Sequence, residues 1–234
     1  MRIGVIGASG FVGSAIFRHL SEISDHESIS ILRGDDFKDK LNGVDFVIHS
    51  ANPAKRFVAN SNPALDRQET LGKTNEFLRT IGSTPILLIS SISCRTQIET
   101  PYAVNRRDCE YAVLDNGGAV VRLGPMFGGT RLQDIIHDIC AGRKVFVAKE
   151  SNYSFSNVDW NGSYIANNFA KVSEIIEIGA RNSIMLSAIA TYTKSESEFS
   201  GEVDNQYPLL FSEGPDVNEV FDFVDKILTS HNLS

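Results

Sequence analysis

Three glycines close to the N-terminus have the spacing of a phosphate-binding turn. Gly7, Gly10 and Gly13 form the pattern Gly-x-x-Gly-x-x-Gly between the apolar run of residues 3–6 and a predicted helix. The first glycine permits a tight turn, the second lets the backbone approach a pyrophosphate, and the third lets the helix pack closely on the strand. The N-terminus of the helix adds N–H donors and the positive end of its dipole. The residues predicted to hold the pyrophosphate of a dinucleotide are Gly7, Ser9, Gly10, Phe11, Val12 and Gly13.

The residues about 20 positions beyond such a turn usually distinguish NAD from NADP. Here they read Leu32-Arg33-Gly34-Asp35-Asp36. The forked guanidinium of Arg33 is suited to clamping a ribose 2′-phosphate, whereas Asp35 is suited to accepting hydrogen bonds from a 2′-hydroxyl. Arg33 comes first, so we expect NADP rather than NAD. The alternative for Arg33 is an ordinary solvent-exposed arginine.

A phosphate-binding glycine turn needs a strand before it and a helix after it. Strand and helix patterns alternate in this way along the chain. This alternation predicts an α/β fold, a doubly wound and mostly parallel Rossmann-type sheet with a small C-terminal portion on the substrate side. The expected strands are residues 3–6, 28–32, 44–49, 85–90 and 119–123. The expected helices between them are residues 11–23, 63–81 and 102–114.

Weaker patterns continue to the C-terminus. We expect a helix at residues 132–141, a short strand at 145–148, a helix at 161–172 and a strand at 184–190. Asp216 and Glu219 resemble a capping box before a final helix. With no evident linker, residues 1–234 are predicted to form a single NAD(P)-binding domain, in which residues from about 150 onward contribute a reduced substrate-binding part. The nine acidic residues between Ser195 and Asp225 indicate a solvated surface.

The composition limits the partners of the chain. It is 42% hydrophobic and 22% charged with a net charge of −7, which is typical of a globular protein and argues against a nucleic-acid partner. No apolar stretch reaches the roughly 18 residues of a membrane span. The N-terminal residues enter a strand directly, so we expect no signal peptide and a cytoplasmic protein. The cysteines and histidines lack metal-ligand spacing, which predicts free thiols and no metal site.

Several segments in order resemble the extended short-chain dehydrogenase/reductase family, which contains NAD-dependent sugar-nucleotide epimerases, dehydratases and keto-sugar reductases. They are Gly7-x-x-Gly10-x-x-Gly13, Val44-Asp-Phe-Val-Ile-His-Ser-Ala51, Ser90-Ser91, Pro101-Tyr102-x-x-x-Arg106, Val121-Arg-Leu-Gly-Pro-Met-Phe-Gly128 and Asn157-Val158-Asp159. The resemblance covers roughly residues 1–165. It implies that Ser50 and Ala51 border the cofactor and that His49 packs in the wall of the cofactor site. It also implies that Asp159 and Trp160 lie near the substrate.

The resemblance further implies a catalytic trio of Ser or Thr, Tyr and Lys. A tyrosine hydroxyl, whose ordinary pKa is about 10, can exchange a proton at neutral pH only if a neighbouring cation lowers that pKa. Tyr102 and position 106 are one helical turn apart and therefore share a helix face. Tyr102 is thus the expected general acid/base and Arg106 its electrostatic partner. Ser91 is expected to orient the reacting oxygen, with Ser93 as the alternative.

Arg106 departs from the family pattern, which has Lys at this position. Arginine keeps the charge but is bulkier, is planar and does not deprotonate. Two functions therefore remain open. One is an NAD(P)-dependent reductase or epimerase acting on a keto-sugar or sugar-nucleotide intermediate. The other is a non-catalytic dinucleotide-binding sensor or scaffold with a degenerate active site.

The resemblance also bears on the size of the sites and on assembly. The connection from Gly13 to Val44 is short for the family, in which another strand and helix normally intervene, and the part after Asp159 is short too. We therefore expect a more open adenine end and a shallower substrate cleft. A homodimer through the helices at residues 64–81 and 102–114 is expected by analogy alone.

Overall fold

The computed structural model describes residues 1–131 and 133–231. The chain divides into two compact units that alternate along the sequence. The first comprises Met1–Leu123 and Asp159–Ile176, and the second comprises Gly124–Val158 and Glu177–Ser234. That the whole chain acts as a single NAD(P)-binding domain stays a prediction.

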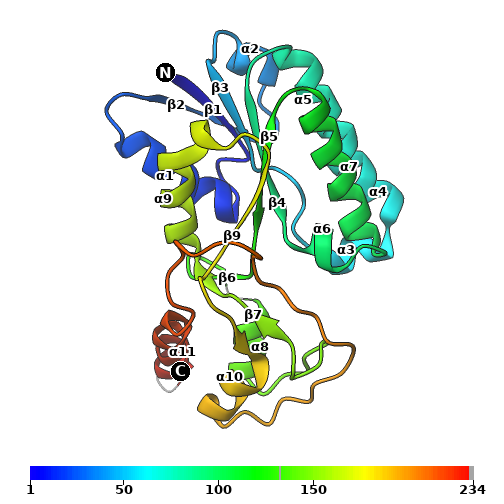
Figure 1. Ribbon diagram of the computed structural model, residues 1–234, viewed down its shortest axis with the longest axis vertical. Coiled ribbons are helices and arrows are strands. Elements are labelled where there is room, and N and C mark those ends of the chain that lie inside the picture. Colours follow the sequence, from blue (N-terminus) through cyan, green and yellow to red (C-terminus); the bar gives the residue numbers. More distant parts are fainter. Residues whose placement is uncertain (132, 232–234) are drawn as a thin grey trace. The chain divides into compact units, whose positions relative to one another are not determined.

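Five strands of the first unit and a sixth that begins in it form one sheet (Figure 1). Its strand order is β2-β1-β3-β4-β5-β9, and the strands β1 to β5 pair in parallel with one another. The strands are β1 (Arg2–Ile6), β2 (Glu27–Ile31), β3 (Phe46–His49), β4 (Ile86–Ser91), β5 (Ala119–Leu123) and β9 (Ile175–Ile178). Parallel strands that are joined through helices bring their carboxyl ends to one edge, where the predicted site residues lie.

Helices cover both faces of this sheet, which confirms the predicted doubly wound fold (Figure 1). Helices α1 (Phe11–Glu22) and α9 (Val158–Asn168) lie on one side. A continuous helical segment lies on the other, made of α4 (Pro63–Arg67), a π-helical turn (Gln68–Gly72) and α5 (Lys73–Ile81), together with α7 (Pro101–Asp115). The short helices of this unit are α2 (Phe37–Leu41), α3 (Arg56–Ser61) and α6 (Ser93–Thr96), and a 3-10 turn (Phe169–Lys171) follows α9.

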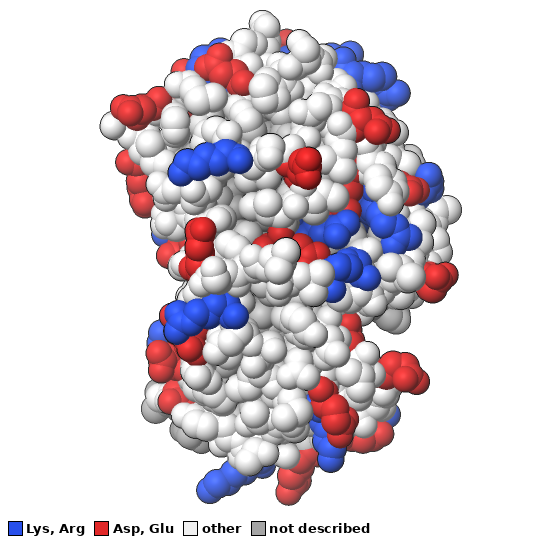
Figure 2. Space-filling view, in the orientation of Figure 1, with Lys and Arg blue, Asp and Glu red and all other residues white. Residues whose placement is uncertain are grey.

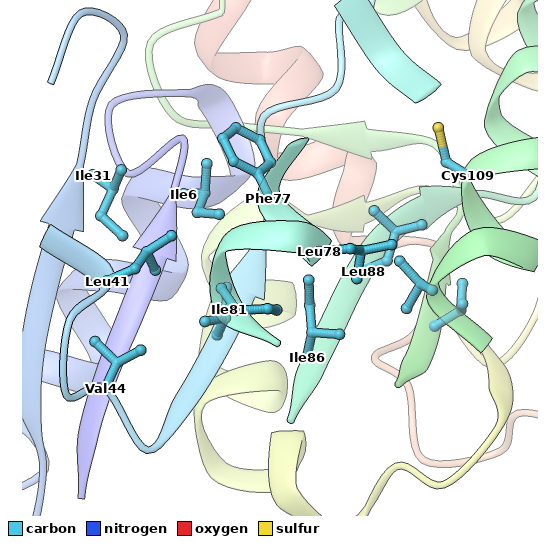
Figure 3. Packing of buried hydrophobic residues seen from close by; sticks show 13 residues of the cluster. Ile6, Ile31, Leu41, Val44, Phe77, Leu78, Ile81, Ile86, Leu88 and Cys109 are labelled. Atoms are coloured by element: carbon cyan, nitrogen blue, oxygen red, sulfur yellow. The ribbon is translucent and has the colours of Figure 1, made fainter. Parts of the chain in front are cut away.

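A buried apolar cluster holds α5 and α7 against the sheet (Figure 3). Phe77, Leu78 and Ile81 of α5 face residues of β1, β3 and β4, such as Leu88, which is fully buried. The aliphatic strand residues of this cluster suit a parallel sheet that is covered on both faces. Burial of apolar area of this kind is the main favourable term in folding.

The connection between β2 and β3 contains only the five-residue helix α2, and all of its residues are described. β2 is therefore the edge strand on the far side of β1. This agrees with the short connection noted in the sequence.

The second unit is built from short elements. β6 (Met126–Phe127) pairs in parallel with β8 (Ser156–Asn157), and β7 (Asn152–Tyr153) pairs antiparallel with β10 (Ile184–Met185). Its helices are α8 (Ile135–Cys140), α10 (Leu186–Thr193) and α11 (Glu219–His231). One apolar cluster joins these three helices to the short strands.

The sequence predictions after β5 were wrong or incomplete at four places. Residues 184–190, predicted as a strand, form two residues of strand followed by α10, because Leu186 and Ile189 are buried at helical spacing. The predicted strand at 145–148 is only an isolated bridge between Val145 and Phe199. β9 was not predicted. The helix expected at 132–141 begins at Ile135, and Leu132 lies outside the described residues.

Charges of both signs are interspersed on the face shown in Figure 2. Within the acidic segment, Asp216 pairs with Arg181 at 2.9 Å and Glu198 pairs with Lys144 at 2.9 Å, both at exposed positions. This agrees with a solvated acidic surface. Among residues 1–131 and 133–231, no helix is both long enough and apolar enough to cross a membrane.

Candidate functional site

The glycine turn joins β1 to α1 and lies against the end of β3. Gly7 has a φ of +85°, and a Cβ at this position would lie 2.8 Å from the carbonyl oxygen of Ser50 and 2.9 Å from the Cα of Ala51. A Cβ at Gly13 would lie 2.8 Å from the carbonyl carbon of Gly7 and would collide with its oxygen. The close approach of three backbone segments therefore requires glycine at positions 7 and 13.

The N-terminus of α1 opens onto this turn. Gly10 is the N-cap residue, and the first turn of the helix holds no acidic residue. Within residues 1–131 and 133–231, no side chain makes a capping hydrogen bond to this end of the helix. Ser9 and Gly10 are exposed, and Phe11 and Val12 are partly buried. An uncapped helix N-terminus with an accessible backbone is suited to an anion such as a phosphate. The structure thus brings the predicted phosphate-binding residues together with Ser50 and Ala51.

The end of β2 presents Arg33 and Asp35 in different ways. The Arg33 side chain is 91% exposed, and one of its terminal nitrogens lies 2.9 Å from the Glu69 carboxylate. The Asp35 carboxylate instead accepts a hydrogen bond of 2.9 Å from the backbone N–H of Leu32 and lies 3.6 Å from Nζ of Lys40. Asp35 therefore closes the local turn, whereas Arg33 projects into solvent.

The serines at the end of β4 belong to two separate hydrogen-bonded pairs. Ser91 Oγ lies 3.2 Å from Ser93 Oγ and accepts a bond of 3.2 Å from the Ser93 N–H. Ser90 Oγ donates a 2.5 Å bond to the fully buried Glu110 carboxylate, which also accepts two bonds from Arg122. Ser91 is partly exposed and Ser93 is buried, so Ser91 is the more accessible of the two candidates.

Tyr102 and Arg106 lie on the same face of α7, as their spacing predicts. The Arg106 guanidinium carbon lies 3.5 Å from the centroid of the Tyr102 ring, and both side chains are buried. Arg106 also donates to the Asp66 carboxylate at 3.1 and 3.3 Å, to the Tyr102 carbonyl at 3.0 Å and to the Pro53 carbonyl. Asp66 balances the charge of Arg106, so the cation is held in place over the aromatic ring.

His49 lies in the interior rather than at the surface of the site. Its Nδ1 accepts from the N–H of Ala51 at 3.3 Å and its Nε2 lies 3.0 Å from Thr74 Oγ1, while its ring packs edge-on against Phe77. Complete burial lowers the pKa of His49 to about 4, so the ring is neutral at pH 7. These contacts agree with a packing role in the wall of the site.

The cysteines are free and offer little nucleophilic character. Burial raises the pKa of Cys94 to about 12 and the pKa of both Cys109 and Cys140 to about 11. They are thiols at neutral pH, and the thiolate is the reactive form. Among the residues that the structure describes, no three Cys, His, Asp or Glu side chains are grouped so as to hold a metal ion.

Asp159 and Trp160 lie in the first turn of α9. The Asp159 carboxylate pairs with Arg18 and lies 2.9 Å from Nε2 of His19 on α1. Burial opposes ionisation, but hydrogen bonds from Arg18 and His19 lower the pKa of Asp159 below its usual value. Trp160 stacks on Tyr164 at 5.3 Å. A place beside the substrate stays a prediction for both residues.

Sequence reasoning missed two residues of this site. Asp66 lies 40 positions before Arg106, and no motif links the two. Asn52 follows the segment that was assigned to the cofactor, and both of its amide atoms are buried. Only the folded chain shows that either residue adjoins the Tyr102–Arg106 pair or the glycine turn.

No family model matches the sequence of this chain and no curated protein matches it significantly, but solved structures similar to it include UDP-sugar epimerases. UDP-glucose 4-epimerase from Thermotoga maritima with UDP-glucose has a TM-score of 0.77 at 15% identity, over 100% of both chains. UDP-glucuronic acid 4-epimerase from Bacillus cereus, in complex with UDP-glucuronic acid and NAD, has a TM-score of 0.75 at 15% sequence identity. That alignment covers 97% of this chain and 100% of the epimerase chain.

RMD from Pseudomonas aeruginosa, complexed with NADPH, has a TM-score of 0.74 at 18% identity. The alignment covers 97% of this chain and 98% of that structure. At sequence identities this low, the similarity shows the fold alone. The chain therefore has the Rossmann-type α/β fold of NAD-dependent epimerase and dehydratase structures, as the sequence resemblance implied.

Proposed function

We propose that this protein is an NAD(P)-dependent reductase or epimerase of the extended short-chain dehydrogenase/reductase type, acting on a keto-sugar or sugar-nucleotide intermediate. The observation that carries the proposal is the glycine turn, where Gly7 abuts Ser50 and Ala51 and Gly13 abuts Gly7. Any side chain at these two positions would displace the backbone that faces the cofactor. The similar structures support the substrate class, since two of them hold UDP-sugars.

The residues present fit a dinucleotide. The uncapped N-terminus of α1 would hold the pyrophosphate, and Ser50 and Ala51 at the end of β3 would border the rest of the cofactor. When bound, the nicotinamide ring supplies a hydride acceptor or donor. Every proton that accompanies hydride transfer must be handled by the protein or by solvent.

Tyr102 is the proposed general acid/base and Ser91 the proposed orienting hydroxyl. The position of the Arg106 guanidinium, 3.5 Å from the centroid of the Tyr102 ring, supports pairing these two residues in the assignment. Arg106 cannot pass on a proton, since a guanidinium does not deprotonate in proteins. Its proposed role is therefore electrostatic, and the proton moves between the Tyr102 hydroxyl and the substrate oxygen.

The proposed cofactor preference is NADP. Arg33 projects from the end of β2, its side chain is 91% exposed and it pairs with Glu69, so a 2′-phosphate can compete for it. Asp35, the candidate acceptor for a 2′-hydroxyl, is engaged with the backbone of Leu32. Both observations favour a phosphate clamp over a hydroxyl acceptor.

A second candidate function is a dinucleotide-binding sensor or scaffold without catalysis. The observation that favours it is the engagement of Arg106 with Asp66 and two backbone carbonyls. These contacts give Arg106 a structural role that does not require catalysis. Turnover separates the two candidates, because both predict dinucleotide binding. The expected homodimer stays a prediction.

Equilibrium binding of NADPH and NADH, followed by fluorescence titration, tests the proposal. We expect NADPH to bind more tightly than NADH. Arg33→Ala should lower the affinity for NADPH about tenfold or more and change the affinity for NADH little, because hydrogen bonds to charged groups contribute about 1.5–3 kcal/mol. Arg79→Ala on α5 is the matched control, because Arg79 is also exposed. Failure of the wild type to bind either dinucleotide would refute both candidate functions.

Activity is then measured with UDP-sugars and keto-sugar nucleotides. A reductase consumes added NADPH, whereas an epimerase converts its substrate without added reductant. Tyr102→Phe should abolish either activity while leaving dinucleotide binding intact. Binding without any turnover in the wild type would favour the sensor or scaffold.

A further inference from the structure

Asn52 carries a buried amide without a hydrogen-bond partner in the part of the chain that the structure describes. The residue follows β3 in the segment Ser50-Ala51-Asn52-Pro53. Its Oδ1 and Nδ2 are both shielded from solvent, and neither has a hydrogen-bond partner among residues 1–131 and 133–231. Proteins rarely bury an amide in this way, because the lost hydration is not replaced. An unsatisfied amide beside a proposed binding site indicates a ligand that completes it.

The neighbours of Asn52 locate it between two parts of the proposed site. On one side, Ala51 Cα lies within 2.9 Å of the position that a Gly7 Cβ would take, so Asn52 is next to the phosphate-binding turn. On the other side, the carbonyl of Pro53 accepts a hydrogen bond from Arg106, whose guanidinium covers the Tyr102 ring. Asn52 therefore lies in the chain between a residue that contacts the glycine turn and a residue that contacts Arg106.

The segment that carries Asn52 is fixed from both ends. The N–H of Ala51 donates to His49 Nδ1 at 3.3 Å, and His49 is itself buried in the sheet. Arg106 is held by the buried Asp66 carboxylate at 3.1 Å and in turn holds Pro53. An amide on such a supported segment is placed before the ligand arrives, which limits the entropy lost on binding.

We propose that Asn52 binds the ribose between the pyrophosphate and the reactive ring of the dinucleotide, with Oδ1 accepting from one hydroxyl and Nδ2 donating to its neighbour. This inference rests on the proposed function. A vicinal diol matches an amide because each hydroxyl can donate or accept. A pyrophosphate at neutral pH offers only acceptors and would leave Oδ1 unsatisfied. The ribose is also the group that separates phosphate from ring in such a cofactor.

Ligand fragments test this placement. Wild type and Asn52→Leu are titrated with the dinucleotide, with ADP-ribose, which keeps the second ribose but lacks the nicotinamide, and with ADP, which lacks both. If NADPH is the tighter cofactor, the 2′-phosphorylated fragments are used. We expect Asn52→Leu to lower the affinity for the dinucleotide and for ADP-ribose about tenfold or more, and to leave the affinity for ADP unchanged.

The other binding outcomes overturn the inference. Weakening of the dinucleotide alone would place Asn52 at the nicotinamide carboxamide. Equal weakening of all three ligands would place it at the phosphates, and no weakening would remove it from the site. If the wild type binds none of the ligands, the proposed function itself has failed, so the two failures are distinguishable.

Thermal unfolding without ligand gives an independent readout. Asn52→Leu replaces an unsatisfied amide by an apolar group of similar size, so we expect its Tm to rise. Asn42→Leu is the matched control, since Asn42 is exposed beside Arg2 at the opposite end of β1, and its Tm should stay unchanged. A lower Tm together with weaker binding would indicate a structural amide and would overturn the inference. Asn52→Ala, which removes the amide without adding bulk, repeats the test if the leucine variant does not fold.

Discussion

Two buried ionic groups lie on α7, one turn apart, and each connects the helix to a different part of the first unit. Arg106 connects it to Asp66 at the end of the segment Pro63–Arg67, and Glu110 connects it to Arg122 on β5. Both groups are almost inaccessible to solvent and each is satisfied by several hydrogen bonds. Buried pairs of this kind add little net stability, but breaking one leaves a charge in the interior.

This difference predicts the effect of removing one partner. Arg106→Met should lower the free energy of unfolding by about 3–5 kcal/mol, because Asp66 then remains buried and unpaired. The double variant Asp66→Asn, Arg106→Met should show a smaller decrease in the free energy of unfolding than Arg106→Met alone, because no unpaired charge then remains buried. Urea denaturation of the two single variants, the double variant and the wild type measures these values and gives the coupling energy.

Arg67→Met is the control for this cycle. Arg67 pairs with Asp108 on the same two helices, but the side chains are 50% and 32% exposed. Loss of this exposed pair in Arg67→Met should lower the free energy of unfolding by about 1 kcal/mol or less. If Arg106→Met were no more costly than Arg67→Met, Arg106 would not be the buried charge that the structure describes.

Prediction from sequence succeeds for single residues where chemistry is local. The spacing of four places Tyr102 and Arg106 on one helix face, and the glycine pattern identifies positions where a Cβ does not fit. It fails where a partner is distant in the chain. Nothing near Arg106 in sequence indicates that Asp66 takes its charge, and nothing near Asn52 indicates that its amide is buried.

At the level of elements, the first unit was the more predictable. Strands β1 to β5 are either continuous apolar runs or alternations bounded by turns, so their positions were predicted to within about two residues. In the second unit short apolar runs are ambiguous. Residues 184–190 are rich in apolar side chains and too short to separate strand from helix by period, and the packing of Leu186 and Ile189 decides the outcome.

The turn between β1 and α1 allows its packing role to be separated from its binding role. Gly13→Ala forces a Cβ against the backbone of Gly7, so we expect destabilisation of about 1–3 kcal/mol or more. A Cβ at Gly10 meets only the Gly7 oxygen at 3.2 Å, so Gly10→Ala should cost less. Because Gly10 is exposed at the proposed phosphate site, the substitution Gly10→Ala should weaken dinucleotide binding.

Thermal unfolding and dinucleotide titration of both variants provide the measurement. Wild-type affinity in a folded Gly10→Ala protein would show that no phosphate approaches the backbone at this turn. Equal Tm values for the two variants would contradict the close contact between Gly13 of α1 and the backbone of Gly7.

At the scale of the whole molecule, the neutral buried His49 makes folding depend on pH. Its pKa is about 4 in the folded chain and 6.5 at its ordinary value. Between these values the unfolded chain binds a proton that the folded chain does not, so the free energy of unfolding falls as pH falls from 6.5 to 4. The full loss is about 3 kcal/mol at pH 4, and His49 contributes none above pH 6.5.

Denaturant unfolding at pH 7.5 and pH 5 measures this dependence in the wild type and in His49→Gln. Glutamine cannot be protonated, so the decrease between the two pH values should be smaller in the variant. The comparison uses the change within each protein, which removes any constant cost of the substitution. Identical decreases would show that His49 takes up a proton in the folded state as readily as in the unfolded state.

The alternation of the two units along the chain has a consequence for synthesis. The edge of β5 is completed by residues just before and within β9, as the bond of 2.8 Å from the Val120 N–H to the Glu174 carbonyl shows. On the ribosome, residues 124–158 emerge before those partners do. During that interval β5 is an open edge on a nearly complete sheet, and open edges recruit other strands. The nascent chain is therefore most exposed to aggregation, or to capture by a chaperone, while the first part of the second unit is being made.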